Sequence, residues 1–129
     1  MLKITREDFS IDEIVQKMKT KETGAIVSFM GFVRGKSKDK IVDKFRIQVS
    51  EEMAIHQLEK IRAKALQKFK VNQIAIVQRI GSLKVSEGIL LIVVDAPHRD
   101  EAFKACRDVL EQIKKVAKMW EKETYKKEN

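Results

Sequence analysis

Apolar residues recur at helical spacing in three segments of the chain. In residues 51–69 they fall every three or four positions, and acidic residues occupy the favourable N-terminal end. A serine followed three residues later by a glutamate has the spacing of a capping box, which predicts a short helix over residues 11–18. A final helix is predicted to begin near Asp100, with one buried stripe of about five turns formed by Phe103, Cys106, Leu110, Ile113, Ala117 and Trp120.

Between these helices the chain is rich in β-branched and aromatic residues. Residues 24–33 predict a buried strand, and the alternating pattern of residues 41–49 predicts a partner strand with one face in water. The lysine-rich turn at residues 35–40 would be the tip of a hairpin joining them. A brief strand should precede Ser10, and turns at Gly81 and Gly88 separate three more strands, over residues 71–77, 83–85 and 89–95.

These elements predict a single α+β domain over residues 1–129, with antiparallel strands and helices packed on one side. The chain is 43% hydrophobic and 36% charged, which is typical of a globular protein with an ionic surface rather than of a disordered chain. Its longest apolar run, residues 89–94, is far shorter than the roughly 20 residues that a transmembrane helix needs, and the N-terminal residues lack the hydrophobic stretch of a signal peptide. We therefore expect a cytoplasmic protein without membrane contact. The charged residues after Trp120 predict a frayed tail.

The formal net charge of +8 favours anionic partners, which include nucleic acids, phosphorylated metabolites and acidic proteins. Both signs are interspersed along the chain, so charge alone does not choose among these partners. The single cysteine, Cys106, excludes an internal disulfide and, with only two histidines, argues against a structural zinc site. Because Cys106 falls within the apolar stripe, we interpret it as a core thiol rather than a nucleophile.

Cationic side chains lie at two places where rigid elements end. Arg34 follows the predicted strand over residues 24–33, and His98 and Arg99 precede the last helix, whose free amides favour anions. The alternative is that Asp100 caps the helix and its neighbours are ordinary surface residues. Lys114 lies about 40° from Leu110, on the border of the apolar stripe, where partial desolvation would suit proton donation. It could equally pack its stem on the stripe with its head in solvent.

Several short motifs occur in an order that is familiar from one protein family. They are Gly24-Ala25, Phe29 to Arg34 as Phe-x-Gly-x-Val-Arg, Met53-Ala54, Arg79-Ile80-Gly81, His98 to Cys106 as His-Arg-x-x-Ala-Phe-x-Ala-Cys, and Trp120 to Glu123 as Trp-x-Lys-Glu. Together they cover nearly the whole chain, and the segment from His98 is the most specific. In these features the chain resembles the large subunits of molybdopterin synthase.

The resemblance implies an α/β-hammerhead-like fold and a sulfurtransferase activity in molybdenum cofactor biosynthesis. The sulfur would come from a thiocarboxylate on the C-terminal glycine of a small ubiquitin-like subunit and would convert cyclic pyranopterin monophosphate into the molybdopterin dithiolene. The family assembles as a homodimer within a heterotetramer, and no cofactor or metal is implied. By position, Lys114 and Lys122 would be catalytic, and the substrate would be bound by Phe32, Val33, Arg34, His98, Arg99, Glu121 and Glu123.

The chain departs from the family pattern at a few positions. Glu121 stands where the family has its second essential lysine, so Lys122 would have to complete the site. Gln48 and Gln78 replace a glutamate and a histidine that are usual in the family. Two alternatives therefore remain at this point: a diverged, inactive relative that only binds the small subunit, and a basic domain that binds nucleic acid.

Overall fold

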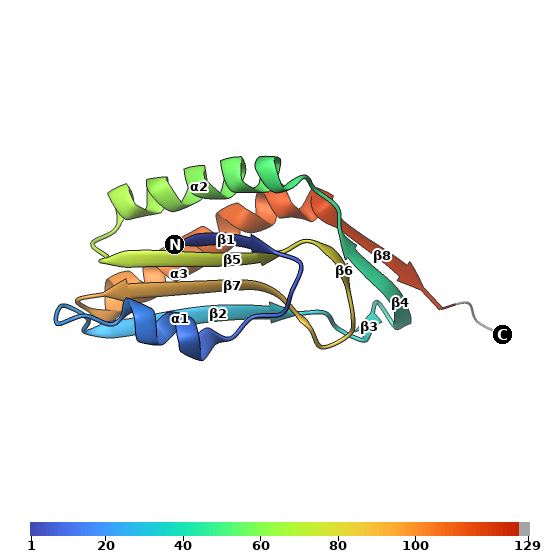
Figure 1. The fold of residues 1–129 in the computed structure, drawn as a ribbon, viewed down its shortest axis with the longest axis horizontal. Coiled ribbons are helices and arrows are strands. Elements are labelled where there is room, and N and C mark those ends of the chain that lie inside the picture. The colour runs from blue at the N-terminus through green and yellow to red at the C-terminus, as the bar shows by residue number, and fades with distance from the viewer. Residues whose placement is uncertain (127–129) are drawn as a thin grey trace.

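A computed structural model, which describes residues 1–126, has two β-sheets and three α-helices (Figure 1). The larger sheet has the strand order β1-β5-β7-β2, formed by Leu2–Thr5, Gln73–Arg79, Gly88–Ala96 and Ala25–Phe32. The expected α+β fold is therefore present, and most strand pairs are antiparallel as predicted. The exception is β1, which runs parallel to β5.

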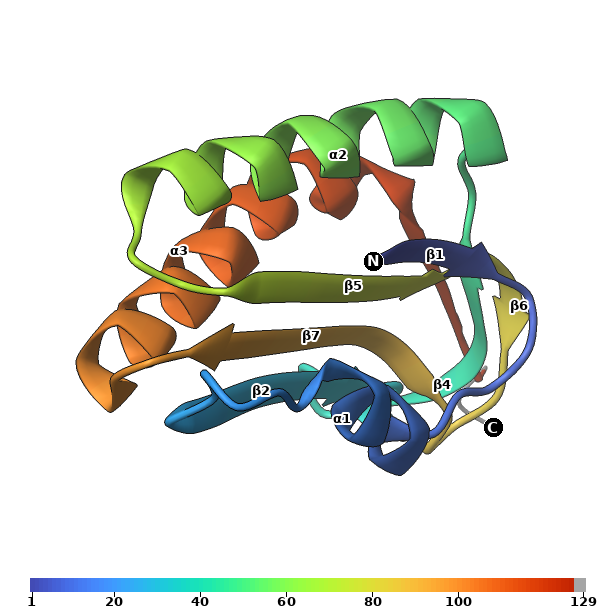
Figure 2. The same ribbon diagram turned by 60° about the vertical axis from the view of Figure 1, so that its left-hand side comes forward.

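Helices cover both faces of this sheet. Figure 2 shows α2 (Glu51–Lys68) and α3 (Arg99–Ala117) together on one face and α1 (Ile11–Met18) on the other. The prediction that all helices lie on one side is wrong for α1. The reason is that the central strands β5 and β7 are buried at almost every position, so that each face needs its own apolar cover.

The smaller sheet is built around β4 (Lys40–Ile47), which pairs with β6 (Gly81–Leu83) on one edge and β8 (Glu121–Tyr125) on the other. The hairpin predicted between residues 24–33 and 41–49 is absent among the described residues, because β2 pairs with β7 instead. The hairpin that β4 does form is with the two-residue strand β3 (Lys36–Ser37), which directly precedes it. The two residues between them, Lys38 and Asp39, both have positive φ, as a tight two-residue hairpin turn requires.

The predicted helix boundaries agree with the structure, but some of the predicted helix caps and buried helix faces do not. α1 has the expected bounds, but the Ser10 side chain makes no capping hydrogen bond. In α2 the Ser50 hydroxyl oxygen accepts a hydrogen bond from the amide of Met53 at 3.1 Å. On α3 the predicted stripe is wrong at Phe103, which is 61% exposed. The buried face of α3 is lined by small and medium residues instead, namely Ala102, Ala105, Cys106, Val109 and Ile113.

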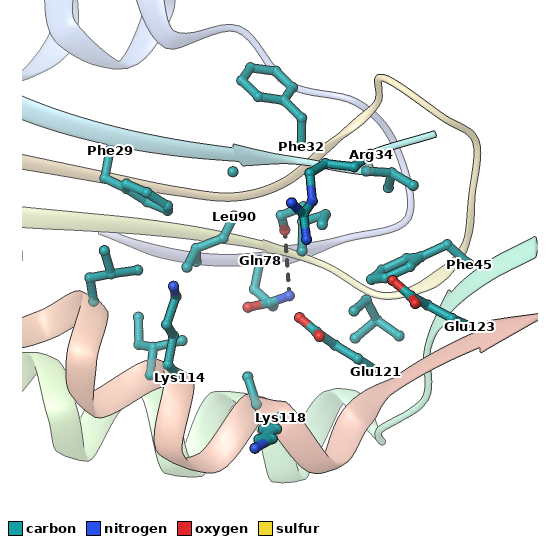
Figure 3. Close-up of a pocket in the computed structure, with 17 residues that line it drawn as sticks. Phe29, Phe32, Arg34, Phe45, Gln78, Leu90, Lys114, Lys118, Glu121 and Glu123 are labelled. Atoms are coloured by element: carbon teal, nitrogen blue, oxygen red, sulfur yellow. Dashed lines mark hydrogen bonds between the residues drawn. The ribbon is translucent and has the colours of Figure 1, made fainter. Parts of the chain in front are cut away.

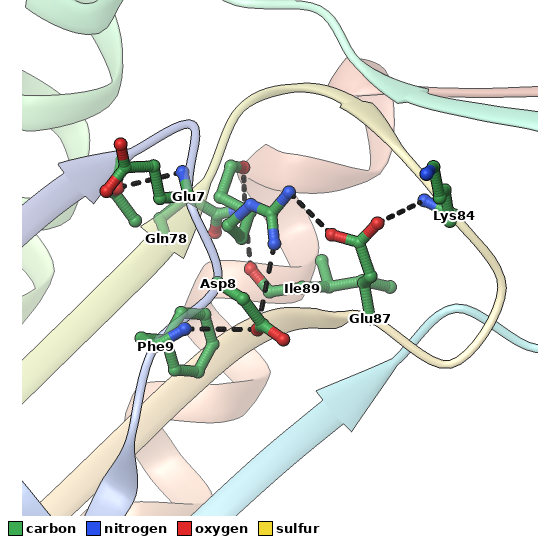
Figure 4. A network of polar contacts seen from close by, with 9 residues as sticks. Glu7, Asp8, Phe9, Gln78, Lys84, Glu87 and Ile89 are labelled. Atoms are coloured by element: carbon green, nitrogen blue, oxygen red, sulfur yellow. Dashed lines mark hydrogen bonds and ion pairs between the residues drawn. The ribbon is translucent and has the colours of Figure 1, made fainter.

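A buried arginine joins two loops at the junction of the sheets (Figure 4). Arg79, at the end of β5, is 3% exposed, and its Nη2 atom lies 2.9 Å from a carboxylate oxygen of Glu87. Its Nη1 atom lies 3.7 Å from Asp8, in the loop before α1. Glu87 also accepts a hydrogen bond from the amide of Lys84. This network fixes the loop before α1 against the turn between β6 and β7.

None of the helices within residues 1–126 is long and apolar enough to cross a membrane.

Candidate functional site

A cavity of about 510 Å³ lies where the two sheets meet the C-terminal half of α3 (Figure 3). Its apolar wall comes from β2, β4 and β7, with the rings of Phe29 and Phe45 and the side chain of Leu90 among its lining residues. Because these strands are held in paired sheets, the wall is rigid. The volume is in the range of small-molecule sites.

Charged residues from four segments of the chain line this cavity. Arg34 follows β2, Lys114 and Lys118 come from the end of α3 and the turn after it, and Glu121 and Glu123 come from β8. In Figure 3 the side chains of Arg34, Lys114 and Glu121 point toward the centre of the cavity. Among the described residues, this cavity therefore combines three cations with two carboxylates.

The turn from α3 into β8 determines which of these groups face the cavity. α3 ends at Ala117, and a 3₁₀ turn, η1 (Lys118–Trp120), leads into β8. Trp120 is only 5% exposed, and its carbonyl oxygen accepts a hydrogen bond of 2.7 Å from the amide of Gln48. The prediction of a frayed tail directly after Trp120 is thus wrong, because residues 121–125 form a strand that pairs with β4.

Strand alternation places the lysine and the glutamates of β8 on opposite faces. Glu121 and Glu123 line the cavity, whereas Lys122 lies directly opposite Arg46 and lines a separate groove on the outer face of the small sheet. Within this chain Lys122 is therefore not one of the groups around Lys114. The position of Lys122 does not agree with the expectation that it completes the site around Lys114.

The electrostatic environment distinguishes Glu121 from its neighbours. Burial raises the pKa of the Glu121 carboxyl, the nearby Glu123 carboxylate raises it further, and Lys114 opposes both effects. The Tyr125 hydroxyl donates a hydrogen bond of 2.7 Å to Glu123, and this bond is the main cause of a raised Tyr125 pKa. The Lys114 side chain is exposed to solvent, contrary to the partial desolvation expected from its position near the stripe.

The remaining predicted site residues are divided between the cavity and a distant surface. The backbone around Phe32 and Val33 lines the cavity, but the Phe32 ring points away from it and is 51% exposed. His98 and Arg99 are exposed at the other end of α3. Fifteen residues of helix, about 22 Å, separate Arg99 from Lys114, so these residues do not meet within one chain.

Sequence reasoning did not assign a site role to several residues that line the cavity, among them Phe29, Gln78 and Lys118. Lys118 is four positions after Lys114 and lies on the same side of the helix end, so that helical spacing alone could have identified it. Gln78 is 1% exposed, and its side-chain amide donates a 2.9 Å hydrogen bond to the carbonyl oxygen of Arg79. The sequence signal for Gln78 was that it is a polar residue within a nearly continuous apolar strand.

Cys106 is buried in the core, and burial raises the pKa of its thiol to about 11. This agrees with its interpretation as a core thiol, because the thiolate is the nucleophilic form. Among residues 1–126 no group of three or more histidine, cysteine or acidic side chains is placed to hold a metal ion.

Comparisons with known proteins agree on one family. The family model described as "MoaE protein" matches residues 4–116. The molybdopterin synthase catalytic subunit of Pyrococcus abyssi is 40% identical over 117 residues, which are 91% of this chain and 79% of the relative. A solved molybdopterin synthase structure from Staphylococcus aureus superposes with a TM-score of 0.88 at 28% identity, covering 98% of this chain and 92% of that one. The same fold occurs in a complex of subunits 1 and 2 of molybdopterin-converting factor from Helicobacter pylori, with a TM-score of 0.74 at 21% identity, covering 99% of this chain and 91% of that one.

Proposed function

The chain belongs to the MoaE family of molybdopterin synthase catalytic subunits, and we propose that the cavity between α3 and β8 is where it transfers sulfur to cyclic pyranopterin monophosphate. The observation that carries this proposal is the convergence of Arg34 and Lys114 on one apolar-walled cavity. A flat pterin ring fits against the aromatic wall, and its phosphate requires cations nearby.

Each cation has a distinct part in this proposal. Arg34 grips the phosphate with its planar guanidinium group, which can make two parallel hydrogen bonds to oxygen atoms. Lys114 lies on the opposite wall and stabilises the negative charge that develops when the cyclic phosphate opens and sulfur is delivered.

The sulfur donor in this proposal is the C-terminal thiocarboxylate of a small ubiquitin-like subunit. A carboxylate-like tail is anionic, and the cavity offers Lys114 and Lys118 on the side toward the helix end. The two-subunit complex from Helicobacter pylori, which contains a chain of this fold, supports a partner of this kind.

A homodimer would bring His98 and Arg99 to the cavity. Because α3 holds them about 22 Å from Lys114 in their own chain, they can only contribute from a second copy. Two large subunits, each with a small subunit, form the heterotetramer that we propose. In it, Arg99 of one copy would bind the phosphate held by Arg34 of the other.

The test is reconstitution. The purified protein is mixed with a sulfur carrier that bears a thiocarboxylate on its C-terminal glycine, together with cyclic pyranopterin monophosphate. We expect dithiolene product, detected after oxidation to a fluorescent pterin, and loss of that product in a Lys114→Ala variant. A folded wild-type protein that binds both components and forms no product would refute the proposal.

A second candidate is a subunit that binds the sulfur carrier without turnover. It is favoured by the carboxylate of Glu121 in the cavity and by the position of Lys122 outside it. This candidate predicts carrier binding with no product, and appearance of product when Glu121→Lys restores an ammonium group to the cavity. Activity of the wild-type protein excludes it.

A further inference from the structure

One chemical step of the proposed sulfur transfer still lacks a residue that would catalyse it. The donor sulfur is bonded to the acyl carbon of the carrier's C-terminal glycine, and in the product it is bonded to carbon of the pterin. After sulfur has attacked the pterin, the two molecules are joined as a thioester, and the acyl–sulfur bond must break. Water is the acyl acceptor that accounts for all atoms, and a neutral water molecule attacks a thioester slowly unless a base removes its proton.

The structure places one carboxylate well for this task. Glu121 is the first residue of β8, directly after the buried Trp120, and its partner across the strand pair is Ile47. This register aims its side chain into the cavity toward the side of Lys114 (Figure 3). The position is fixed by the strand pairing and by the hydrogen bond from the Gln48 amide to the Trp120 carbonyl oxygen.

Glu123, the second carboxylate of the cavity, is less suited to accept a proton. Its Oε2 atom already accepts the 2.7 Å hydrogen bond from the Tyr125 hydroxyl. The Glu121 carboxylate accepts no hydrogen bond from any other residue in the described range 1–126, so both of its oxygens remain available to water. We propose that Glu121 is the general base that activates water to hydrolyse the thioester between the carrier and the pterin. This inference rests on the proposed function.

The step balances as follows. The Glu121 carboxylate takes a proton from water while the water oxygen attacks the acyl carbon of the thioester. The carbon–sulfur bond breaks, the electron pair stays on sulfur, and the pterin leaves as a thiolate that Lys114 stabilises. The acyl group leaves on the carrier as a carboxylic acid, which ionises and releases the second proton of the water to solvent. Glu121 returns the first proton to solvent as well. No oxidant or reductant is needed.

The charged groups around Glu121 support this role. Lys114 faces it from the end of α3, Glu123 lies on its own strand, and Arg34 comes from the segment after β2, while Lys118 lines the cavity from η1. Burial, followed by the effect of Glu123, raises the pKa of Glu121 above that of an ordinary carboxyl group. A base whose pKa lies closer to the working pH accepts a proton more effectively in the transition state than an ordinary carboxylate does.

The experiment compares the wild-type protein with Glu121→Gln, which keeps the shape of the side chain and removes its basicity. Each is mixed with the thiocarboxylated carrier and cyclic pyranopterin monophosphate, and the products are followed in time by intact-protein mass spectrometry and by pterin fluorescence. Glu111→Gln is the matched control, because Glu111 is exposed on α3 in an ion pair with Arg107 and does not line the cavity.

We expect Glu121→Gln to accumulate the covalent carrier–pterin adduct and to release product about 100-fold more slowly, while Glu111→Gln behaves as wild type. The rate of adduct breakdown should fall in acid for the wild-type protein, and this dependence should disappear in Glu121→Gln. Equal rates without adduct in wild type and Glu121→Gln would overturn the inference while leaving the proposed function intact. A Glu121→Lys variant that hydrolyses the adduct as fast as wild type would overturn it as well. If the wild-type protein forms no product at all, the proposed function and this inference fail together.

Discussion

Replacing Trp120 by alanine tests whether this residue anchors the strand that carries Glu121. Trp120 is 5% exposed, so the substitution removes nearly a whole indole from the core. Truncations of this kind cost about 3–5 kcal/mol, because the transfer free energy is lost and a cavity remains. With an unfolding entropy of about 0.27 kcal/mol/K for a chain of this length, the midpoint of thermal unfolding should fall by about 11–18 °C.

The assay is urea unfolding followed by circular dichroism, with Met119→Ala as the control. Met119 is adjacent in the chain and 73% exposed, so its truncation should change the free energy of unfolding by less than about 0.5 kcal/mol. Since Trp120 directs β8 against β4, Trp120→Ala should also lower sulfur transfer by more than the fraction of unfolded protein explains. A cost below about 1 kcal/mol, or one equal to that of Met119→Ala, would refute the assignment of Trp120 as the anchor.

Three further substitutions follow from the packing and the charges. Gly24→Ala would place a methyl group 1.9 Å from the carbonyl oxygen of Pro97, and calorimetry should show a loss of about 2–3 kcal/mol. Glu87→Ala leaves the buried Arg79 with only Asp8 at 3.7 Å, and should cost about 2–3 kcal/mol in urea unfolding. The raised pKa of Glu121 means that the folded state binds its proton more tightly than the unfolded state. The stability of the wild type relative to Glu121→Gln should therefore be highest below the ordinary carboxyl value of 4.5 and decrease as the pH rises through the raised value.

Matched controls separate these effects from general damage. Gly35→Ala puts its new methyl group 3.5 Å from a side-chain carbon of Val85, an ordinary contact, and should be nearly neutral. Glu111→Ala breaks an exposed ion pair and should cost at most about 0.5 kcal/mol. Losses in these controls equal to those in the test variants would contradict the reasoning, as would a stability difference between wild type and Glu121→Gln that does not change with pH.

Local patterns in the sequence were enough to predict the helices. The bounds of α1 and α2 follow from the spacing of apolar residues, and that spacing is a property of each segment alone. Strand pairing is not local. The segment over residues 24–33 looks like half of a hairpin with residues 41–49, yet its partner is β7, some sixty residues later in the chain. Nothing in the spacing of side chains distinguishes these partners before the sheets assemble.

The same limit applies to the site. Arg34 could be identified because it lies at the end of a predicted strand, where a rigid framework presents its side chain, and Lys114 because helical spacing places it at the border of the apolar stripe. The orientation of Glu121 and Lys122 could not be predicted, because it depends on whether the chain is helix or strand after Trp120. A helix turns successive side chains by about 100°, whereas a strand alternates them, and the charged tail after Trp120 gave no signal for a strand.

The central claim is that one active site combines Lys114 of one copy with His98 and Arg99 of another, and complementation between two inactive variants tests it most directly. Lys114→Ala and His98→Ala proteins are each inactive alone in this account, but in a mixed dimer one of the two cavities regains all of its groups. Unfolding and refolding the variants together at equal amounts should restore roughly a quarter of wild-type sulfur transfer, because half of the dimers are mixed and each has one intact site. No activity above that of the separate variants, with mixed dimers shown to form, would contradict the account.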